Sequence, residues 1–392
     1  MGRLLIVSGP GAVAKRFALG GRVLSAVPLG DGHINATYVA TAVAESGPRR
    51  RYVLQRINRG VFHDPEAVVR NTTRVIEHLT ARLREEGGDP EREVLRLVCT
   101  IDGGASLCDA EGEVWRCYEM IERATARSTL AGPEQAYTVA KAFGRFLRWM
   151  SDFPSRELEI TIPGFHDPVR HLRALQTAVR ADPLDRKSEA GDEIAFIEGR
   201  EDVILNWGNR QLSGEMPLRA VHNDTKINNV LIDEETGCGI CVIDLDTVMP
   251  GSAVVDIGDC VRSALTRIDD TAWRPEVFAG VVRGYLSEIG ALLTGVEIES
   301  VVAASRAVAL ELGTRFLSDF VTGDHWFPAA SPSENLDRCR GQLDIVRWIE
   351  EEEAALQETV RRAAVCCEQI LQRGSGPKDL IRFRLDGGRT RR

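Results

Sequence analysis

Hydrophobic and polar positions change their pattern about one third of the way along the chain. Before that point apolar residues alternate with polar ones, and this period of two predicts five strands, at residues 22–28, 37–43, 52–57, 94–101 and 113–121. A helix is expected between the third and fourth strands, from about residue 65 to residue 86. Apolar residues recur there at helical spacing, and Gly87-Gly88 follows.

From Gly132 onward the pattern is helical. Apolar residues at helical spacing predict six long amphipathic helices, at residues 134–151, 168–181, 192–212, 275–293, 301–322 and 333–372. Only residues 218–244 look like short strands and tight loops. The sequence therefore predicts an α+β protein of two lobes, with a small antiparallel-sheet lobe at residues 1–122 and a larger, mainly helical lobe at residues 123–392.

Charge and composition narrow the classes of function. The formal net charge of −9 argues against non-specific binding to nucleic acid. No apolar run has the length of a membrane span, and the run at residues 4–7 is too short for a signal peptide. We therefore expect a cytoplasmic protein, a monomer or homodimer, without membrane or nucleic-acid partners. Cys238 and Cys241 indicate a turn between two strands, because a structural zinc site needs a second ligand pair.

The stretch that indicates chemistry begins at His222. Asp224 follows two positions later and Asn229 five positions after that, and the next apolar strand ends in Asp244 and Asp246. Phosphoryl transfer needs a carboxylate that orients and deprotonates the acceptor hydroxyl, and oxygen ligands that hold Mg²⁺. Asp224 fits the first role. Asn229 and Asp244 fit the second, with Asp246 as a further metal ligand. A hairpin with turn-forming Asn and Asp residues is the alternative, and the complete spacing between two strands disfavours it.

The same stretch resembles the aminoglycoside-phosphotransferase and choline-kinase superfamily, and more closely its N-acetylhexosamine 1-kinase group. The resemblance extends over nearly all of the chain, through residues 30–38, 52–58, 162–167, 222–231, 242–251, 315–319 and 323–324. It implies a protein-kinase-like fold, ATP and Mg²⁺ as cofactors, and phosphorylation of a sugar acceptor at the anomeric C1 hydroxyl of an N-acetylhexosamine. It also implies that Asp256 braces the catalytic loop.

The resemblance implies a nucleotide site formed by Gly30, Gly32, His33, Asn35, Thr37, Gln55 and Met120. The glycines would let backbone N–H groups approach phosphate, but without the acidic residues an ordinary hairpin turn would explain them better. Such kinases carry a lysine where this chain has Gln55. Another cation must therefore neutralise the phosphates, or the site must rely on magnesium. Glu77 is a candidate for the helix residue that would pair with this position. Met120 lies where the chain is expected to pass between the lobes, beside adenine.

For the acceptor, the resemblance implies contacts from His33, Phe165, His166, Asn223, Arg315 and Trp326. On the residues alone, Arg315 reads as one half of a surface ion pair, and packing explains Phe165 and His166 equally well. Sugar kinases of this group tend to have tyrosine where Trp326 stands. Tryptophan keeps a stacking face and an N–H donor but has no hydroxyl, so the identity of the sugar stays open.

Three alternative interpretations fit parts of the sequence less well. Residues 4–16 look like a strand running into a phosphate loop, but Ala14 replaces the last glycine and Arg16 cannot ligate magnesium, so a strand and helix packed on the small lobe fit better. A non-catalytic nucleotide-binding protein would suit Gln55, yet it would not need a base and metal ligands together. A choline, homoserine or aminoglycoside kinase is the alternative enzyme. Choline would call for an aromatic cage with acidic groups, and an aminoglycoside for a carboxylate-rich pocket.

Overall fold

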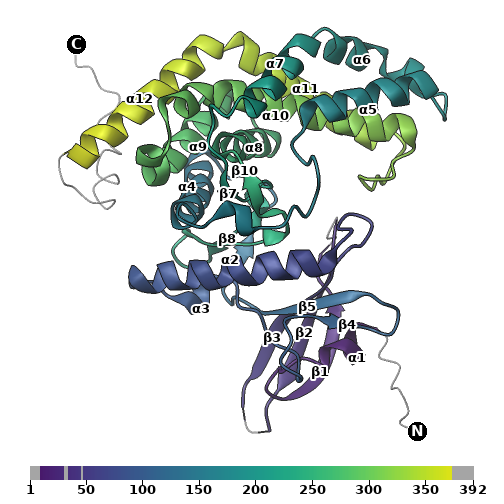
Figure 1. Cartoon of the computed structure of the whole chain (residues 1–392), viewed down its shortest axis with the longest axis vertical. Helices are drawn as coiled ribbons and strands as arrows, with labels where there is room; N and C mark the ends of the chain where they lie inside the picture. Colours follow the sequence, from purple (N-terminus) through teal and green to yellow (C-terminus); the bar gives the residue numbers. More distant parts are fainter. Residues whose placement is uncertain (1–8, 31–33, 46, 373–392) are drawn as a thin grey trace.

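The computed structural model describes residues 9–30, 34–45 and 47–372. Figure 1 shows two parts, a curled sheet formed by the first third of the chain and a larger mass of helices formed by the rest. The long helix α2 (Pro65–Glu85) lies between them. The predicted α+β architecture is confirmed.

The N-terminal sheet has the strand order β1-β2-β3-β5-β4, and every neighbouring pair is antiparallel. Its strands are β1 (Arg22–Pro28), β2 (Ala36–Val43), β3 (Arg49–Arg56), β4 (Leu107–Cys108) and β5 (Val114–Glu119). Alternation gives the sheet two faces. Leu54 and Cys117 lie on the face that packs against the short helix α1 (Pro10–Ala14). Gln55 and Arg116 lie on the other face, toward α2 and the helical part.

The prediction of a strand at residues 94–101 is wrong. Only isolated bridges form there, between Leu97 and Tyr118 and between Thr100 and Phe17. The segment divides its backbone hydrogen bonds between β5 and the chain around residues 16–18. Because each partner pairs with only a few residues, no continuous ladder develops.

Helix α2 joins the sheet to the helical part. It begins after Asp64, whose Oδ1 accepts a hydrogen bond from the backbone N–H of Ala67 at 3.0 Å. Further along, Asn71 Nδ2 donates to the backbone oxygens of Glu159 at 2.8 Å and Val248 at 3.3 Å. The helix therefore holds the sheet against the loop that carries Asp244 and Asp246.

The remaining helices are α3 (Pro90–Glu93), α4 (Pro133–Trp149), α5 (Pro168–Ala181), α6 (Gly191–Glu198), α7 (Glu201–Leu212), α8 (Ala253–Thr266), α9 (Arg274–Ile289), α10 (Gly295–Thr322), α11 (Glu334–Glu351) and α12 (Glu353–Gln372). Two predicted helices are each split, 192–212 after Glu198 and 333–372 after Glu351. None of the helices in the described part of the chain is both long enough and apolar enough to cross a bilayer.

Helix α8 is the long helix that the sequence pattern did not predict; the four-residue α3 was not predicted either. Of the 14 residues of α8, 13 are buried. The helix does carry charged residues at helical spacing, Asp256, Asp259 and Arg262, but they lie on a face that packs inside the protein instead of facing solvent. It brings Asp256 and Asp259 into the interior, beneath the loop that follows β7 (Arg219–Val221).

The loop-rich stretch forms two small sheets. One has the order β6 (Ala124–Ala126), β8 (Val230–Asp233), β9 (Gly239–Val242), and the other pairs β7 with β10 (Met249–Gly251). The predicted lobe boundary at residue 122 falls between β5 and β6, which pairs with β8 in the helical part. Cys238 and Cys241 follow the turn between β8 and β9, so the turn interpretation is confirmed.

Candidate active site

The loop after β7 is held in place by helix α8. The carboxylate of Asp256 accepts hydrogen bonds from the backbone N–H groups of His222 and Asn223, each at 2.8 Å. Asn223 has a φ of 62°, a left-handed conformation that asparagine tolerates. Burial raises the pKa of Asp256 to about 7, although the two N–H donors oppose the rise. Asp256 therefore braces the loop, as predicted.

The His222 ring sets the spacing between this loop and the strand that precedes Asp244. It is fully buried against two phenylalanines of α4. Its Nε2 lies 3.0 Å from the backbone oxygen of Ile243, and its Nδ1 accepts from the backbone N–H of Asp224 at 3.3 Å. One nitrogen donates and the other accepts, so the ring is neutral. Burial lowers the pKa of His222, in agreement with that form.

Asp224 lies at the centre of the loop and is only 6% exposed. Lys226 Nζ is 2.9 Å from each of its carboxylate oxygens. Burial favours a higher pKa for Asp224, but Lys226 outweighs it and the pKa lies below its ordinary value. The carboxylate is therefore ionised at neutral pH and can accept a proton. Lys226, two positions after Asp224, is a site residue that the sequence reasoning missed although the motif contains it.

Asn229 and Asp244 present oxygen atoms suited to Mg²⁺. Asn229 Nδ2 donates to the backbone oxygen of Asp224 at 2.9 Å and to its Oδ2 at 3.3 Å. Both neighbours are acceptors, so the amide nitrogen must face them and Oδ1 stays available. Asp244 has a φ of 61°, and its carboxylate has no hydrogen-bond partner among the residues the structure describes.

The charge around Asp244 also fits a divalent cation. Burial, Asp246 and Asp224 raise the pKa of Asp244 to about 7, and a cation would stabilise these clustered carboxylates. Among the described residues, no three His, Cys, Asp or Glu side chains form a complete metal cluster. Magnesium does not need one, because it usually keeps water and phosphate ligands.

The structure gives both oxygens of Asp246 a partner. Oδ1 lies 2.5 Å from Arg116 Nη2, and Oδ2 accepts from Asn35 Nδ2 at 2.7 Å. Arg116 also donates two hydrogen bonds to Gln55 Oε1, at 2.8 and 3.1 Å. Metal binding by Asp246 stays a prediction, and its contacts favour Asn229 and Asp244 as the ligands. Arg116 is the buried cation beside Gln55 that the sequence pattern left unassigned.

Four of the predicted nucleotide residues, Gly30, Asn35, Thr37 and Gln55, lie at one end of β2 and β3. Gln55 Nε2 donates to Thr37 Oγ1 at 3.2 Å, and Gly30 has a φ of 62° in the turn between β1 and β2. That left-handed conformation, with open space where a Cβ would lie, suits a turn that approaches a ligand. Gly32 and His33 lie outside the described residues. Nucleotide binding by this set stays a prediction.

Two further expectations concern neighbouring elements. Met120, just after β5, donates its backbone N–H to the oxygen of Arg51 at 3.1 Å, which extends the sheet and commits this donor. A contact of Met120 with adenine stays a prediction. Glu77, guessed as a helix partner, is exposed, and the residue of α2 that faces Arg116 is Thr72, with Oγ1 3.5 Å from Nη1.

On the acceptor side, Arg315 extends from α10 between two aromatic rings. Its guanidinium carbon lies 5.2 Å from the ring centroid of Phe165 and 5.5 Å from that of Phe327. Burial lowers the pKa of Arg315, while the carboxylates of Glu311 and Asp224 oppose that shift. The guanidinium has no hydrogen bond or ion pair among the described residues, so its N–H groups are free for a ligand.

The aromatic residue beside Arg315 is Phe327 and not Trp326, whose side chain is 67% exposed. The reason lies in the turn after α10. Asp319 accepts hydrogen bonds from the backbone N–H groups of His325, Trp326 and Phe327 in succession. This turn carries Phe327 inward and leaves Trp326 outside. A role for Trp326 in acceptor binding stays a prediction.

His166 and Asn223 connect neighbouring segments. His166 Nε2 lies 2.8 Å from the backbone oxygen of Asn223, and Nδ1 lies 3.2 Å from Glu311 Oε1. Burial disfavours the charged ring, but Glu311 prevails and raises the pKa of His166 to about 9. Asn223 Nδ2 donates to the backbone oxygens of Thr247 at 3.0 Å and Met249 at 3.3 Å. Both side chains are held by internal contacts, and acceptor binding by them stays a prediction.

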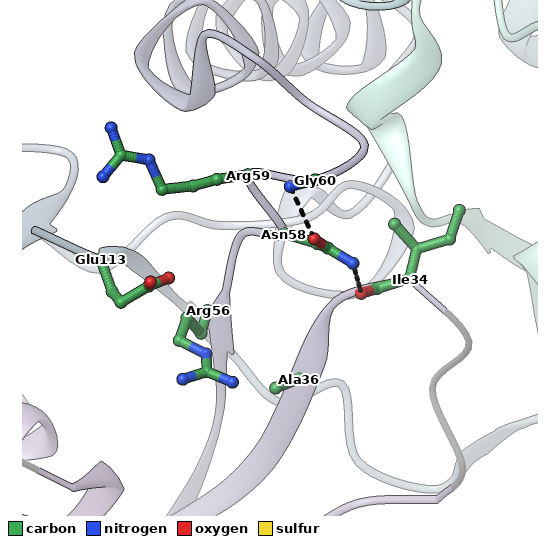
Figure 2. A pocket seen from close by; sticks show the side chains of 7 residues that line it. All are labelled: Ile34, Ala36, Arg56, Asn58, Arg59, Gly60 and Glu113. Carbon is green, nitrogen blue, oxygen red and sulfur yellow. Dashed lines mark hydrogen bonds between the residues drawn. The ribbon is translucent and has the colours of Figure 1, made fainter. Parts of the chain in front are cut away.

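A separate hollow of about 370 Å³ is shown in Figure 2. It is lined by Ile34, Ala36, Arg56, Asn58, Arg59, Gly60 and Glu113. Arg56 alternates with Gln55 along β3, so the two side chains leave the strand on opposite faces. The sheet therefore lies between this hollow and the cluster around Asp224, and the candidate site is not built on it.

Comparison with known proteins identifies the family. A model of the APH phosphotransferase enzyme family matches residues 25–290, which is more than half of the chain. The chain belongs to this family. It is thus a small-molecule phosphotransferase, and the sequence-based resemblance is confirmed at the level of the superfamily.

Solved structures show the same fold. An aminoglycoside phosphotransferase from Alicyclobacillus acidocaldarius superposes with a TM-score of 0.60 at 16% identity, covering 91% of this chain and 96% of that one. The amicoumacin kinase hAmiN, solved with AMP-PNP, Ca²⁺ and Ami, superposes with a TM-score of 0.57 at 14% identity, covering 84% of this chain and 91% of that one. A microcompartment-associated aminopropanol kinase superposes with a TM-score of 0.56 at 17% identity, covering 88% of this chain and 98% of that one. The predicted two-lobed kinase-like fold is confirmed.

Proposed function

We propose that this member of the family transfers the γ-phosphoryl group of ATP to the C1 hydroxyl of an N-acetylhexosamine. The observation that carries the choice of acceptor is the charge beside Asp224. Arg315 is a free cation between two aromatic rings, and the nearby carboxylates are already paired, Glu311 with His166 and Asp259 with Arg262. A neutral sugar hydroxyl suits that charge better than an ammonium group does.

Each residue of the catalytic loop has a role in this proposal. Asp224 orients the acceptor hydroxyl and takes its proton, while Lys226 holds the carboxylate ionised. Asn229 and Asp244 hold magnesium. Bound magnesium would neutralise the phosphate oxygens. AMP-PNP and Ca²⁺ in the hAmiN complex support ATP and a divalent cation as the cofactors.

The alternative acceptor is a small amino alcohol or an aminoglycoside, as the names of the similar structures suggest. Such acceptors are cations and call for unpaired carboxylates or an acidic aromatic cage. Among the described residues around Arg315 the aromatic rings are present, but the carboxylates are engaged in ion pairs. The balance of charge therefore favours the neutral sugar.

The test is ADP release from Mg-ATP with a panel of acceptors: N-acetylglucosamine, N-acetylgalactosamine, glucose, galactose, choline, homoserine and kanamycin. We expect turnover with an N-acetylhexosamine and none with the cationic acceptors. Turnover with choline, homoserine or kanamycin alone would keep the family and overturn the sugar acceptor. Silence with every acceptor, while ATP binds, would favour a binding protein on the same fold.

A further inference from the structure

On the face of the N-terminal sheet that is turned toward α2, a buried positive charge lies on β5 instead of β3. Kinases neutralise nucleotide phosphates with a lysine on the third strand, but β3 presents the uncharged Gln55 at this face. Arg116 on β5 is directly opposite Gln55 in the antiparallel pairing. Opposite residues project from the same face, so Arg116 delivers a cation to the place that Gln55 leaves neutral.

The Arg116 guanidinium is fixed on several sides and is 1% exposed. Nε and Nη2 donate to Gln55 Oε1 at 3.1 and 2.8 Å, and Nη2 lies 2.5 Å from Asp246 Oδ1. Nη1 reaches Thr72 Oγ1 at 3.5 Å, and the Tyr118 ring centroid lies 5.2 Å from the guanidinium carbon. A buried cation persists only with such pairing, so this charge is held before any ligand arrives.

The network lies between the two segments that flank the candidate nucleotide site. Asn35, at the entry to β2, donates to Asp246 Oδ2 at 2.7 Å and so links the ion pair to the segment after the Gly30 turn. Asp246 is two residues beyond Asp244, whose carboxylate also acts electrostatically on Arg116. Without Arg116, incoming phosphates would meet the carboxylates of Asp224, Asp244 and Asp246 with Lys226 as the nearby counter-charge.

We propose that Arg116 is the positioning cation of the nucleotide-phosphate site, supplied from β5 in place of the β3 lysine. It offsets Asp246, which acts as its counter-ion, and thereby lets a polyphosphate enter a cluster of carboxylates. Gln55 clamps the guanidinium in this position. This inference rests on the proposed function and deepens it, because it concerns how the same site binds ATP.

The test compares calorimetric binding of ADP and of adenosine, with Mg²⁺ present, to the full chain. Arg116→Met should weaken the affinity for ADP by about tenfold or more and leave the affinity for adenosine nearly unchanged, because only the phosphates of ADP interact with the Arg116 charge. Gln55→Lys/Arg116→Met returns a cation to the same face from β3, and it should restore most of the ADP affinity. The matched control is Arg56→Met, which removes an exposed cation from the opposite face of β3 and should change neither ligand.

Other outcomes separate the two claims. Equal loss of adenosine and ADP in Arg116→Met would mean that the residue is only structural, and unchanged ADP binding would mean that it is dispensable; either result overturns the inference. If Arg116→Met does not fold, the double variant decides, because its lysine again gives Asp246 a counter-charge. A folded double variant that binds adenosine but has lost ADP refutes the inference. A wild-type chain that binds neither ligand would refute the proposed function itself.

Discussion

Replacement of Glu311 by glutamine removes the carboxylate that keeps His166 charged. The two ring nitrogens of His166 face the backbone oxygen of Asn223 and Glu311 Oε1, at 2.8 and 3.2 Å. Both neighbours are acceptors, so only the protonated ring, which donates from both nitrogens, satisfies them. With an amide in place of the carboxylate, burial should dominate and the ring should become neutral.

The size of the effect follows from the pKa of His166. Burial acts against protonation, yet Glu311 raises this pKa from its ordinary 6.5 to about 9. The folded state therefore holds the proton more tightly than the unfolded state does. The resulting stability is complete below pH 6.5 and is lost as the pH rises through about 9. At about 1.4 kcal/mol per pKa unit, the free energy of unfolding should fall by about 2 to 3 kcal/mol between pH 7 and pH 10.

The assay is urea denaturation of the wild type and of Glu311→Gln at pH 6, 7, 8, 9 and 10. We expect the variant to be less stable at pH 7 by about 2 to 3 kcal/mol and to show little further loss at higher pH. Glu350→Gln is the control, because Glu350 pairs with Arg200, which does not titrate in this range. A wild-type stability that stays level from pH 7 to pH 10, or an unchanged slope in the variant, would refute a charged His166.

Three further variants test other contacts. Asp256→Ala leaves the two backbone N–H groups after β7 without their acceptor, so it should cost about 3 kcal/mol in urea unfolding, more than Asp256→Asn costs. Arg315→Ala should raise the acceptor KM about tenfold at an unchanged KM for ATP, whereas Arg306→Ala, on the same helix but paired with Glu353, should not. Phe327→Ala should raise the acceptor KM more than Trp326→Ala, because Phe327 contacts Arg315 and Trp326 is exposed; the reverse order would restore the sequence-based pocket.

Local periodicity predicted most of the fold. Strands β2 and β3 and helices α2, α4 and α5 lie within a few residues of their predicted places, because each buries one face and therefore shows a regular pattern. Strand β1 also lies at its predicted place, although none of its residues is fully buried. The exceptions have physical causes. Helix α8 is buried all round, so its charged residues do not mark a solvent-exposed face, and residues 94–101 share their hydrogen bonds between two partners.

The site was predictable where its residues are close in sequence. Asp224, Asn229 and Asp244 follow one another along a short loop and strand, so their spacing predicted that they would lie together. Arg116 depends on the register between β3 and β5, and Phe327 on the turn that Asp319 organises. These are tertiary contacts, and no spacing within the chain shows them.

The proposed reaction is transfer of phosphate to a sugar C1 hydroxyl with Asp224 as the base. The most direct measurement is ³¹P NMR of Mg-ATP and an N-acetylhexosamine incubated with the wild type and with Asp224→Asn. We expect ADP together with a phosphomonoester coupled to the anomeric proton, formed roughly a hundredfold to ten-thousandfold more slowly by the variant. Inorganic phosphate alone, a phosphomonoester on another hydroxyl, or equal rates from the two proteins would contradict the proposed reaction.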